Sequence, residues 1–97
     1  MITIVAKSFV KEGCIEKFIE IAQEHVRESR KEEGCISFNL YQDLKDKQVF
    51  TFIEEWENQG AIDKHNGTER IKALGPKMSE VRVEKAQINM FECIETK

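Results

Sequence analysis

The most constraining feature of this 97-residue chain is that its expected β-strands carry apolar residues on both faces. Within residues 48–56, Phe50 and Phe52 share one face of the strand, whereas Val49 and Ile53 share the other. A strand of an antiparallel sheet that exposes one face to water usually alternates apolar with polar residues. The sequence therefore predicts a sheet that is covered on both faces.

The spacing of apolar residues and turn residues predicts four strands and three helical segments. The strands are expected at residues 2–10, 35–44, 48–56 and 81–95, and the helices at 13–33, at 59–65, and from Thr68 past an interruption at Gly75–Pro76 to Met78. The order β-α-β-β-α-β is typical of the ferredoxin-like α+β fold, whose helices cover one face of a four-stranded antiparallel sheet. We therefore expect a single domain over residues 1–97.

The helices of such a fold leave the second face of the sheet uncovered. A second copy of the same sheet is the economical cover, because a domain of this length buries only about 60–65% of its unfolded surface when it is alone. A monomer whose open face tolerates scattered apolar residues is the alternative. The strand expected at 81–95 favours a homodimer through the helix-free sheet face, since its end could pair with the partner's edge.

The composition argues against several classes of partner. The chain has 15 Lys and Arg against 18 Asp and Glu, a formal charge of −3, and no basic run, which argues against nucleic acid. No apolar run approaches the roughly 18 residues of a membrane span, and no basic stretch precedes the first apolar run, as it would in a signal peptide. We therefore expect a cytoplasmic protein. The three widely spaced cysteines are expected to be reduced thiols rather than metal ligands.

His65 is the first candidate for chemistry. It lies four residues after Ala61 and three after Ile62, which places it on the apolar side of its short helix. A half-buried imidazole can accept or donate a proton near neutral pH. Periodicity alone favours the alternative, a packed structural histidine, and it favours that alternative more strongly for His25 on the long helix.

Glu54 and Trp56 are two residues apart on a strand and therefore share a face with Phe50 and Phe52. A carboxylate among aromatic side chains should be neutral or paired, because burial of an isolated charge is costly. The indole N–H of Trp56 is a hydrogen-bond donor beside an apolar wall. These residues belong either to a pocket or to a core in which Glu54 forms a buried ion pair, for which Arg30 is a candidate partner.

Several motifs are absent from the sequence. It contains no glycine-rich phosphate loop, no GxSxG, no HExxH and no paired-cysteine metal site. Their absence argues against an enzyme driven by a nucleotide or by a metal. It is compatible with an enzyme that needs no cofactor.

The segment Arg30–Cys35 (RKEEGC), then Phe38, then Glu54–Trp56 (EEW) and finally His65 follow one another in a recognisable order. In this order and spacing, over nearly the whole chain, the sequence resembles the antibiotic biosynthesis monooxygenase (ABM) family. The resemblance implies a dimeric α+β barrel with a buried pocket between the sheet and the helices of each protomer. Members of that family include cofactor-independent oxygenases of quinols and polycyclic phenols, haem-degrading enzymes, and an isomerase of a phosphorylated signalling sugar.

The resemblance also implies roles for individual residues. Glu54, Trp56 and His65 match pocket residues of the family, and Phe38 takes a place that Tyr often holds. Family members often have a second histidine five residues after the first, and here that position is Arg70. This departure weakens a mechanism with two histidines, and it suits an anionic substrate, because arginine recognises carboxylate and phosphate well.

The expected function is that of a cofactor-free monooxygenase of a small quinol or phenolic substrate. His65 would act as the base, and Trp56 and Glu54 would orient the substrate and stabilise developing charge. The expected substrate-binding residues are Phe38, Phe52, Arg70, Ile71 and Met78. One alternative is an isomerase or lyase of a small phosphorylated or carboxylated sugar. Another is a ligand-binding or stress-response dimer without catalysis.

Overall fold

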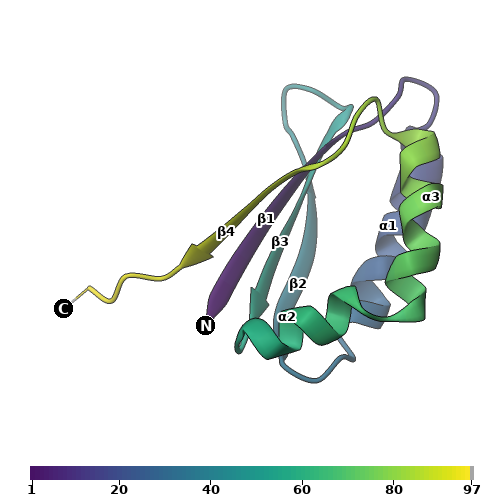
Figure 1. Cartoon of the computed structure of the whole chain (residues 1–97). Helices are drawn as coiled ribbons and strands as arrows, with labels where there is room; N and C mark the ends of the chain where they lie inside the picture. Colours follow the sequence, from purple (N-terminus) through teal and green to yellow (C-terminus); the bar gives the residue numbers. More distant parts are fainter. Residues whose placement is uncertain (97) are drawn as a thin grey trace.

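In the computed structural model, which describes residues 1–96, four strands form one antiparallel sheet and three helices lie on one of its faces (Figure 1). The elements in chain order are β1 (Ile2–Phe9), α1 (Ile15–Ser29), β2 (Cys35–Gln42), β3 (Val49–Trp56), α2 (Gln59–Asn66), α3 (Glu69–Val81) and β4 (Gln87–Glu92). The strand order in the sheet is β2-β3-β1-β4. The predicted ferredoxin-like α+β fold is thereby confirmed, with α2 and α3 together in the place of the second helix.

The register of the strands determines which side chains face the helices. Ala6 on β1 lies opposite Phe52 on β3 and Ile88 on β4, so these three side chains project from the same face of the sheet. Ile4 and Ser8 project with Ala6, because side chains alternate along a strand. Since the members of this set on β1 and β3 are all buried, this face is the helix-covered one.

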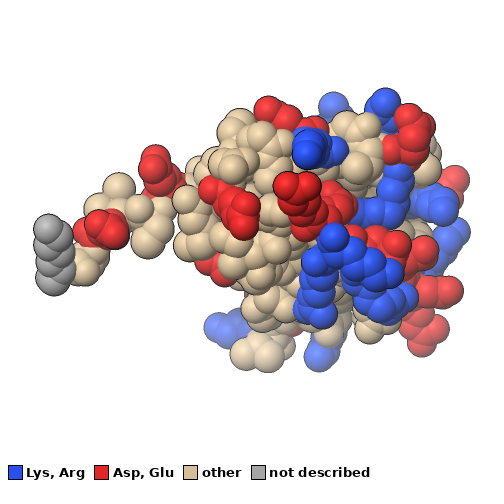
Figure 2. Space-filling model, turned by 90° about the horizontal axis from the view of Figure 1, so that it is seen from below, with Lys and Arg blue, Asp and Glu red and all other residues tan. Residues whose placement is uncertain are grey.

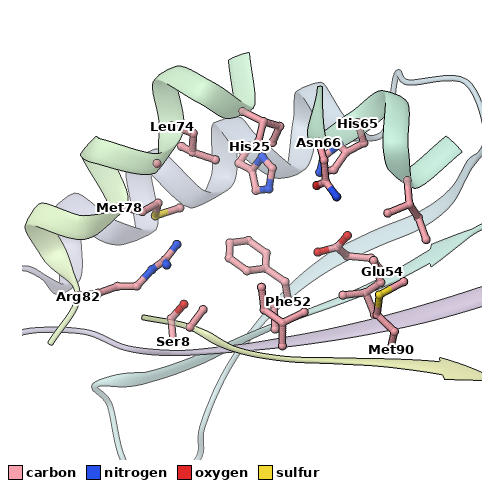
Figure 3. A pocket seen from close by; sticks show the side chains of 17 residues that line it. Ser8, His25, Phe52, Glu54, His65, Asn66, Leu74, Met78, Arg82 and Met90 are labelled. Atoms are coloured by element: carbon pink, nitrogen blue, oxygen red, sulfur yellow. The ribbon is translucent and has the colours of Figure 1, made fainter. Parts of the chain in front are cut away.

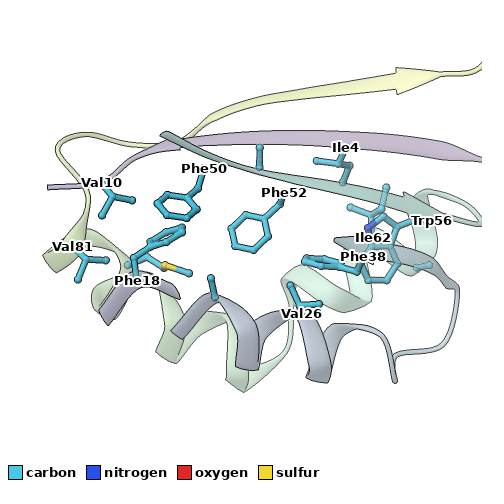
Figure 4. Close-up of a cluster of buried hydrophobic side chains, with 14 residues drawn as sticks. Ile4, Val10, Phe18, Val26, Phe38, Phe50, Phe52, Trp56, Ile62 and Val81 are labelled. Carbon is cyan, nitrogen blue, oxygen red and sulfur yellow. The ribbon is translucent and has the colours of Figure 1, made fainter. Parts of the chain in front are cut away.

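The hydrophobic core fills the space between the helices and this face of the sheet (Figure 4). Phe18 of α1 packs against Phe50 and Phe52, with ring centroids 4.8 and 6.3 Å away. Tilted aromatic pairs of this kind add to the stabilisation that comes from burial. Ala22 and Val26 follow Phe18 at helical spacing and are also buried, as the sequence predicted.

Helix α1 is shorter than predicted at both ends. The sequence indicated residues 13–33, whereas α1 covers Ile15–Ser29. Gly13 has a φ of +86°, which lies outside the right-handed helical region, so the helix begins only after it. After the last turn of α1 the N–H of Glu32 donates to the carbonyl three residues earlier, and Gly34, also with a φ of +86°, completes the change of direction. Glu32 therefore lies in a turn rather than on the helix.

Gly75 and Pro76 do not interrupt the third helix, contrary to the prediction. Helix α3 runs from Glu69 to Val81 with Pro76 inside it. A proline within a helix removes one backbone hydrogen bond and destabilises that turn. Beyond it, Met78 and Val81 are almost completely buried in the core, and their burial stabilises the final turns of the helix.

The last strand is much shorter than predicted. The sequence indicated residues 81–95, but β4 covers Gln87–Glu92, because Val81 is buried at the end of α3 and does not belong to the sheet. Directly after that helix, Arg82 forms an isolated antiparallel bridge with Val10. The boundaries of the other three strands and of α2 lie within two residues of the predicted ones.

Apolar side chains are exposed on the helix-free face of the sheet and along β4. Phe91 on β4 is 52% exposed, Tyr41 on β2 is 51% exposed, and Ile53 on β3 is 37% exposed. Strand β4 forms one edge of the sheet, and residues 93–96 after it project away from the body of the protein (Figure 1). This single chain therefore leaves part of its apolar surface uncovered.

The remaining surface carries both signs of charge. Figure 2 shows acidic and basic side chains next to one another on the helical side of the molecule. Within residues 1–96, no helix has the length and apolar character that crossing a membrane would require.

Candidate active site

A cavity of about 260 Å³ lies between the helix-covered face of the sheet and the helices (Figure 3). Its walls are largely apolar and include Ile4, Phe52, Ile62, Ile71, Met78 and Met90. Polar side chains occupy its two ends, with Glu54, His65 and Asn66 at one end and Ser8 and Arg82 at the other (Figure 3). An apolar cavity with a few polar groups is the usual form of a small-molecule site.

His65 lies in the last turn of α2 and lines this cavity. Its side chain is almost completely buried, and its ring packs against Trp56 with centroids 4.7 Å apart. Burial lowers the pKa of His65 below its usual value, and the positive charge of Arg70 acts in the same direction, while the hydrogen bond to Glu32 opposes both. The imidazole is therefore neutral at pH 7 and can accept a proton.

Glu32 determines which nitrogen of His65 accepts that proton. Its Oε1 lies 2.8 Å from Nδ1 of His65, and its Oε2 forms an ion pair with Arg70. A carboxylate that is paired with arginine accepts hydrogen bonds and donates none. Nδ1 of His65 must therefore carry the proton of the neutral ring, and Nε2 keeps the lone pair.

Glu54 and Trp56 form a hydrogen-bonded pair beside His65. The indole Nε1 of Trp56 donates to Oε1 of Glu54 at 2.9 Å. Burial raises the pKa of Glu54 to about 7; the bond from Trp56 opposes this rise and the negative charge of Glu32 adds to it. Glu54 lines the cavity, so it presents a carboxyl group that is partly protonated near neutral pH.

The alternative in which Glu54 forms an ion pair with Arg30 is wrong. Nε of Arg30 donates to the carbonyl oxygen of Phe38 at 2.9 Å, and Nη2 donates to Oδ1 of Asn39 at 2.8 Å. The guanidinium group of Arg30 thus forms its hydrogen bonds with the backbone and a side chain of β2. Glu54 has its neutral partner in Trp56 instead.

His25 of α1 also lines the cavity, a position for which the sequence favoured a purely structural histidine. Nη1 of Arg70 lies 2.8 Å from its Nδ1, and because arginine can only donate, Nδ1 is the acceptor and Nε2 carries the proton. Burial, followed by electrostatic repulsion from Arg70, His65 and Arg82, lowers the pKa of His25 to about 3. His25 is therefore a neutral donor at physiological pH.

Arg70 does not line the main cavity, although it was predicted to contact the substrate. It lies beside a smaller cavity of about 120 Å³, and its guanidinium group bonds to Glu32, to Oγ of Ser29 and to His25. The guanidinium group of Arg70 thus forms its hydrogen bonds with other residues of the protein. Arg70 therefore supports Glu32 and His25 rather than reaching the space beside His65.

The other predicted site residues divide into two groups. Phe52, Ile71 and Met78 line the cavity as expected of substrate-binding residues. Phe38 and Trp56 are fully buried behind it, with ring centroids 6.3 Å apart, and neither lines it. Their large aromatic side chains are part of the core that supports His65 and Glu54 from behind.

Ser8, Asn66 and Arg82 line the cavity but were not singled out from the sequence as pocket residues. The alternation of β1 contained the signal for Ser8, because it shares a face with Ile4 and Ala6. Arg82 could not be found in this way, since the sequence placed it in the last strand. Within residues 1–96, no group of three or more His, Cys, Asp or Glu side chains is arranged to hold a metal ion.

Comparison with known proteins identifies the family. Residues 1–76 match the family described as antibiotic biosynthesis monooxygenase. The chain belongs to the antibiotic biosynthesis monooxygenase (ABM) family. The matched region contains Glu54, Trp56 and His65 and ends within α3.

Two curated proteins are similar in sequence to most of this chain. The "Uncharacterized protein sll1783" of Synechocystis is 33% identical over 87 residues, which make up 90% of this chain and 59% of that protein. This chain thus spans less than two thirds of the length of that relative. The "Putative monooxygenase YcnE" of Bacillus subtilis is 31% identical over 81 residues, which make up 84% of this chain and 85% of that protein.

Solved structures share the fold. A conserved protein from Methanosarcina mazei Go1 has a TM-score of 0.89 and 33% identity, covering 93% of this chain and 89% of its own. The crystal structure of an antibiotic biosynthesis monooxygenase has a TM-score of 0.91 and 28% identity, covering 98% and 100%. A Deinococcus radiodurans protein reaches a TM-score of 0.93 at 18% identity, covering 100% and 96%, and shows the fold alone. The ABM chain therefore has the fold class of the dimeric α+β barrels, as predicted.

Proposed function

We propose that this ABM protein is a cofactor-independent monooxygenase that oxidises a small quinol or phenol with molecular oxygen. The observation that carries the proposal is the geometry of His65. Its ring lines an apolar cavity, and Glu32 engages Nδ1 so that Nε2 is left as the acceptor. The cavity of about 260 Å³ is slightly smaller than the range of about 300–1,000 Å³ that is usual for ligand sites, which suits a substrate of one or two rings.

The first step is the removal of a phenolic proton by Nε2 of His65. A neutral imidazole with a lone pair directed at the hydroxyl group acts as a general base. The proton on Nδ1 remains hydrogen-bonded to Glu32, whose negative charge stabilises the imidazolium ion that forms. The product of this step is a phenolate, which is far more easily oxidised than the phenol.

Oxygen then reacts directly with the phenolate. The phenolate transfers one electron to O₂, and the resulting superoxide and phenoxyl radical combine to form a carbon–oxygen bond at a ring carbon that bears hydrogen. The peroxide takes up one proton, and loss of the ring hydrogen as a proton breaks the O–O bond. One oxygen atom stays on the ring as a carbonyl and the other leaves as water, so one O₂ is consumed for each molecule of substrate.

Glu54 is suited to supply the proton that the peroxide needs. Its carboxyl group lines the cavity near His65, and burial raises its pKa to about 7. A carboxylic acid with this pKa can donate a proton at neutral pH and recover it afterwards. The indole N–H of Trp56 fixes Oε1 of Glu54 at 2.9 Å and so orients the donor.

The isomerase or lyase alternative loses its main support. It relied on Arg70 to hold an anionic sugar beside His65, but Arg70 does not line that cavity and its guanidinium group is bonded to Glu32, Ser29 and His25. The largely apolar walls also suit an aromatic ring better than a sugar.

We further propose that the ABM protein works as a homodimer paired through its helix-free sheet face. Tyr41, Ile53 and Phe91 are exposed on that face of the isolated chain, and their burial against a second copy would stabilise the assembly. Because a two-fold interface is self-complementary, the same patch serves on both protomers.

Oxygen uptake tests the monooxygenase proposal. A panel of benzene and naphthalene quinols is incubated with wild type, His65→Ala and the control Lys64→Ala, which removes the exposed neighbour of His65 on α2. We expect uptake above the rate of autoxidation, one ¹⁸O atom from ¹⁸O₂ in the product, and a loss of about 10²–10⁴-fold in the His65 variant only. No uptake with any quinol, or equal uptake in His65→Ala, would contradict the proposal. A ligand that binds and is recovered unchanged would support the binding protein instead.

A further inference from the structure

The end of the cavity opposite His65 contains polar atoms that the protein itself does not satisfy. Ser8 and Arg82 both line the cavity there, whereas Glu54, His65 and Asn66 lie at the other end, with Phe52 between the two groups (Figure 3). Within the described residues, Oγ of Ser8 and Nε of Arg82 are buried and have no hydrogen-bond partner. Buried polar atoms normally have partners, because an unsatisfied one costs stability.

The backbone places these two side chains on the same face of the sheet. Ser8 is on β1 between Ala6 and Val10 on the helix-covered face, and its side chain is 1% exposed. Arg82 is bridged to Val10 across the chain, and the next N–H, that of Val83, donates to the carbonyl oxygen of Phe9 at 2.8 Å. Residues that pair across a bridge project to the same side, so Arg82 reaches the same face as Ser8.

Arg82 differs from the other arginines around the core. Arg70 is bonded to Glu32, Ser29 and His25, and Arg30 is bonded to β2. Among residues 1–96, no acidic side chain forms an ion pair with Arg82, and burial lowers the pKa of its guanidinium group without a compensating anion. The half-buried cation thus lacks an acidic partner among the residues that the structure describes.

We propose that Ser8 and Arg82 form a subsite for a carboxylate group of the ligand. A guanidinium group binds the two oxygens of a carboxylate through parallel N–H bonds, and the hydroxyl group of Ser8 supplies a further donor. The apolar middle of the cavity then holds an aromatic ring, whose hydroxyl group faces His65 at the other end. The substrate class is therefore a hydroxylated aromatic carboxylate. The role of its hydroxyl group rests on the proposed function, whereas the carboxylate subsite does not.

Anaerobic calorimetry tests the subsite without any turnover. Matched probes are 4-hydroxybenzoate and 6-hydroxy-2-naphthoate, each compared with its neutral methyl ester. We expect wild type to bind at least one acid about tenfold or more tightly than its ester. In Arg82→Gln this ratio should fall close to one while affinity for the ester stays within about twofold.

Two further variants separate direct contact from other effects. Ser8→Ala removes an unsatisfied hydroxyl group, so the protein should keep its fold, and its affinity for the acid should fall several-fold. Lys85→Gln removes an exposed positive charge three residues after Arg82 and should leave the acid-to-ester ratio unchanged. Thermal unfolding of each variant verifies that it is folded, and the Arg82 Nε–H signal in ¹⁵N NMR spectra should shift with the acid only.

The outcomes distinguish the subsite from the proposed reaction. An unchanged ratio in Arg82→Gln, an ester that binds as well as the acid in wild type, or no binding of any probe would overturn the subsite. Acid binding that depends on Arg82, together with no oxygen uptake, would leave the subsite in place and remove the monooxygenase. Turnover of neutral quinols, with no preference for acids over esters in binding, would support the monooxygenase and overturn the subsite.

Discussion

His25 and His65 lie with their ring centroids 5.7 Å apart, and their Nδ1 atoms have opposite kinds of partner. Arg70 donates to Nδ1 of His25 at 2.8 Å, whereas Glu32 accepts from Nδ1 of His65 at 2.8 Å. Because arginine can only donate and a carboxylate only accepts, Nε2 carries a proton in His25 and a lone pair in His65. The cavity therefore has a neutral imidazole donor beside a neutral imidazole acceptor.

Substitution of Glu32 by glutamine should reverse the tautomer of His65. In Glu32→Gln the amide can donate to Nδ1, which stabilises the ring with its proton on Nε2 and removes the lone pair from the cavity. We expect kcat/KM for quinol oxidation to fall by at least about tenfold, and by less than the 10²–10⁴-fold loss for removal of the base. The ¹⁵N signals of the His65 ring should report the exchange of protonated nitrogen directly.

Glu33→Gln is the matched control for this change. Glu33 is the adjacent residue, is exposed, and lies 3.9 Å from Lys64 rather than near His65. Its substitution should leave both the kinetics and the His65 spectrum unchanged. If the ring signals of His65 are the same in Glu32→Gln and wild type, Glu32 does not set the tautomer.

Glu54 should make stability fall as pH rises toward neutral. Burial raises its pKa from 4.5 to about 7, so the folded state holds this proton more tightly than the unfolded chain. Between these two values folding takes up a proton, and the free energy of unfolding decreases with increasing pH. A pKa shift of this size corresponds to a loss of up to about 3 kcal/mol in the free energy of unfolding, and this loss is complete above pH 7.

Glu54→Gln isolates this contribution. Urea unfolding is measured for both proteins between pH 4 and 8. As pH rises, the free energy of unfolding of the variant should increase relative to that of wild type by up to about 3 kcal/mol. His25 and His65 titrate in both proteins, so their contributions largely cancel in the difference. Glu57→Gln, which removes an exposed carboxylate three residues later, controls for net charge. A difference between Glu54→Gln and wild type that does not depend on pH would show that the proton is not held on Glu54.

The main features of the fold could be predicted from the sequence because they depend on periodicity. The helix-facing side of β3 was visible in Phe50 and Phe52, and the face of α1 in Phe18 and Ala22. These patterns reflect burial, which local spacing records directly. The end of α3 was different, since Pro76 indicated a break that the burial of the following residues overrides.

The site was only partly predictable, because its contacts join distant parts of the chain. Glu32 and His65 form a hydrogen bond although they are 33 residues apart in the sequence. The turn after α1 that makes this contact possible has no periodic pattern in the sequence. Arg70 departs from the family pattern, but its partners Glu32 and His25 could not be predicted from residue spacing. Arg82 was assigned to a strand that does not include it.

Gly34 should be the least replaceable glycine of the chain. Gly34 and Gly13 both have a φ of +86°, where any other L-residue is strained by roughly 1–2 kcal/mol. A Cβ at position 34 would also overlap Cβ of Ala61 on α2, whereas one at position 13 has nothing within 4 Å. In chemical unfolding we expect Gly13→Ala to cost about 1 kcal/mol and Gly34→Ala clearly more, because α2 must move. Equal losses in the two variants would mean that the contact with Ala61 relaxes freely.

A charge on the helix-free sheet face should dissociate the proposed homodimer. Ile53 is on β3, inside the sheet, and its side chain is 37% exposed in the single chain. Full burial of an exposed side chain of this size contributes about 1.5–3 kcal/mol, and the partly covered Ile53 contributes at most the lower end of that range. Two-fold symmetry buries the side chain of Ile53 in both protomers, and the aspartate adds the cost of burying two charges. In Ile53→Asp we therefore expect the dimer dissociation constant, measured by sedimentation equilibrium, to rise by at least about 100-fold.

Leu44→Asp separates this effect from the removal of any exposed apolar side chain. Leu44 is 95% exposed in the loop between β2 and β3, so its substitution introduces the same charge away from the proposed interface. The dissociation constant of Leu44→Asp should match that of wild type, and its thermal stability should depend on protein concentration in the same way. The interface proposal fails if wild type sediments as a monomer, or if Ile53→Asp and Leu44→Asp dimerise equally well. In the second case the partner would have to be bound elsewhere, and the exposed edge strand β4, with Ile88 and Met90 at the cavity, would be the surface to test next.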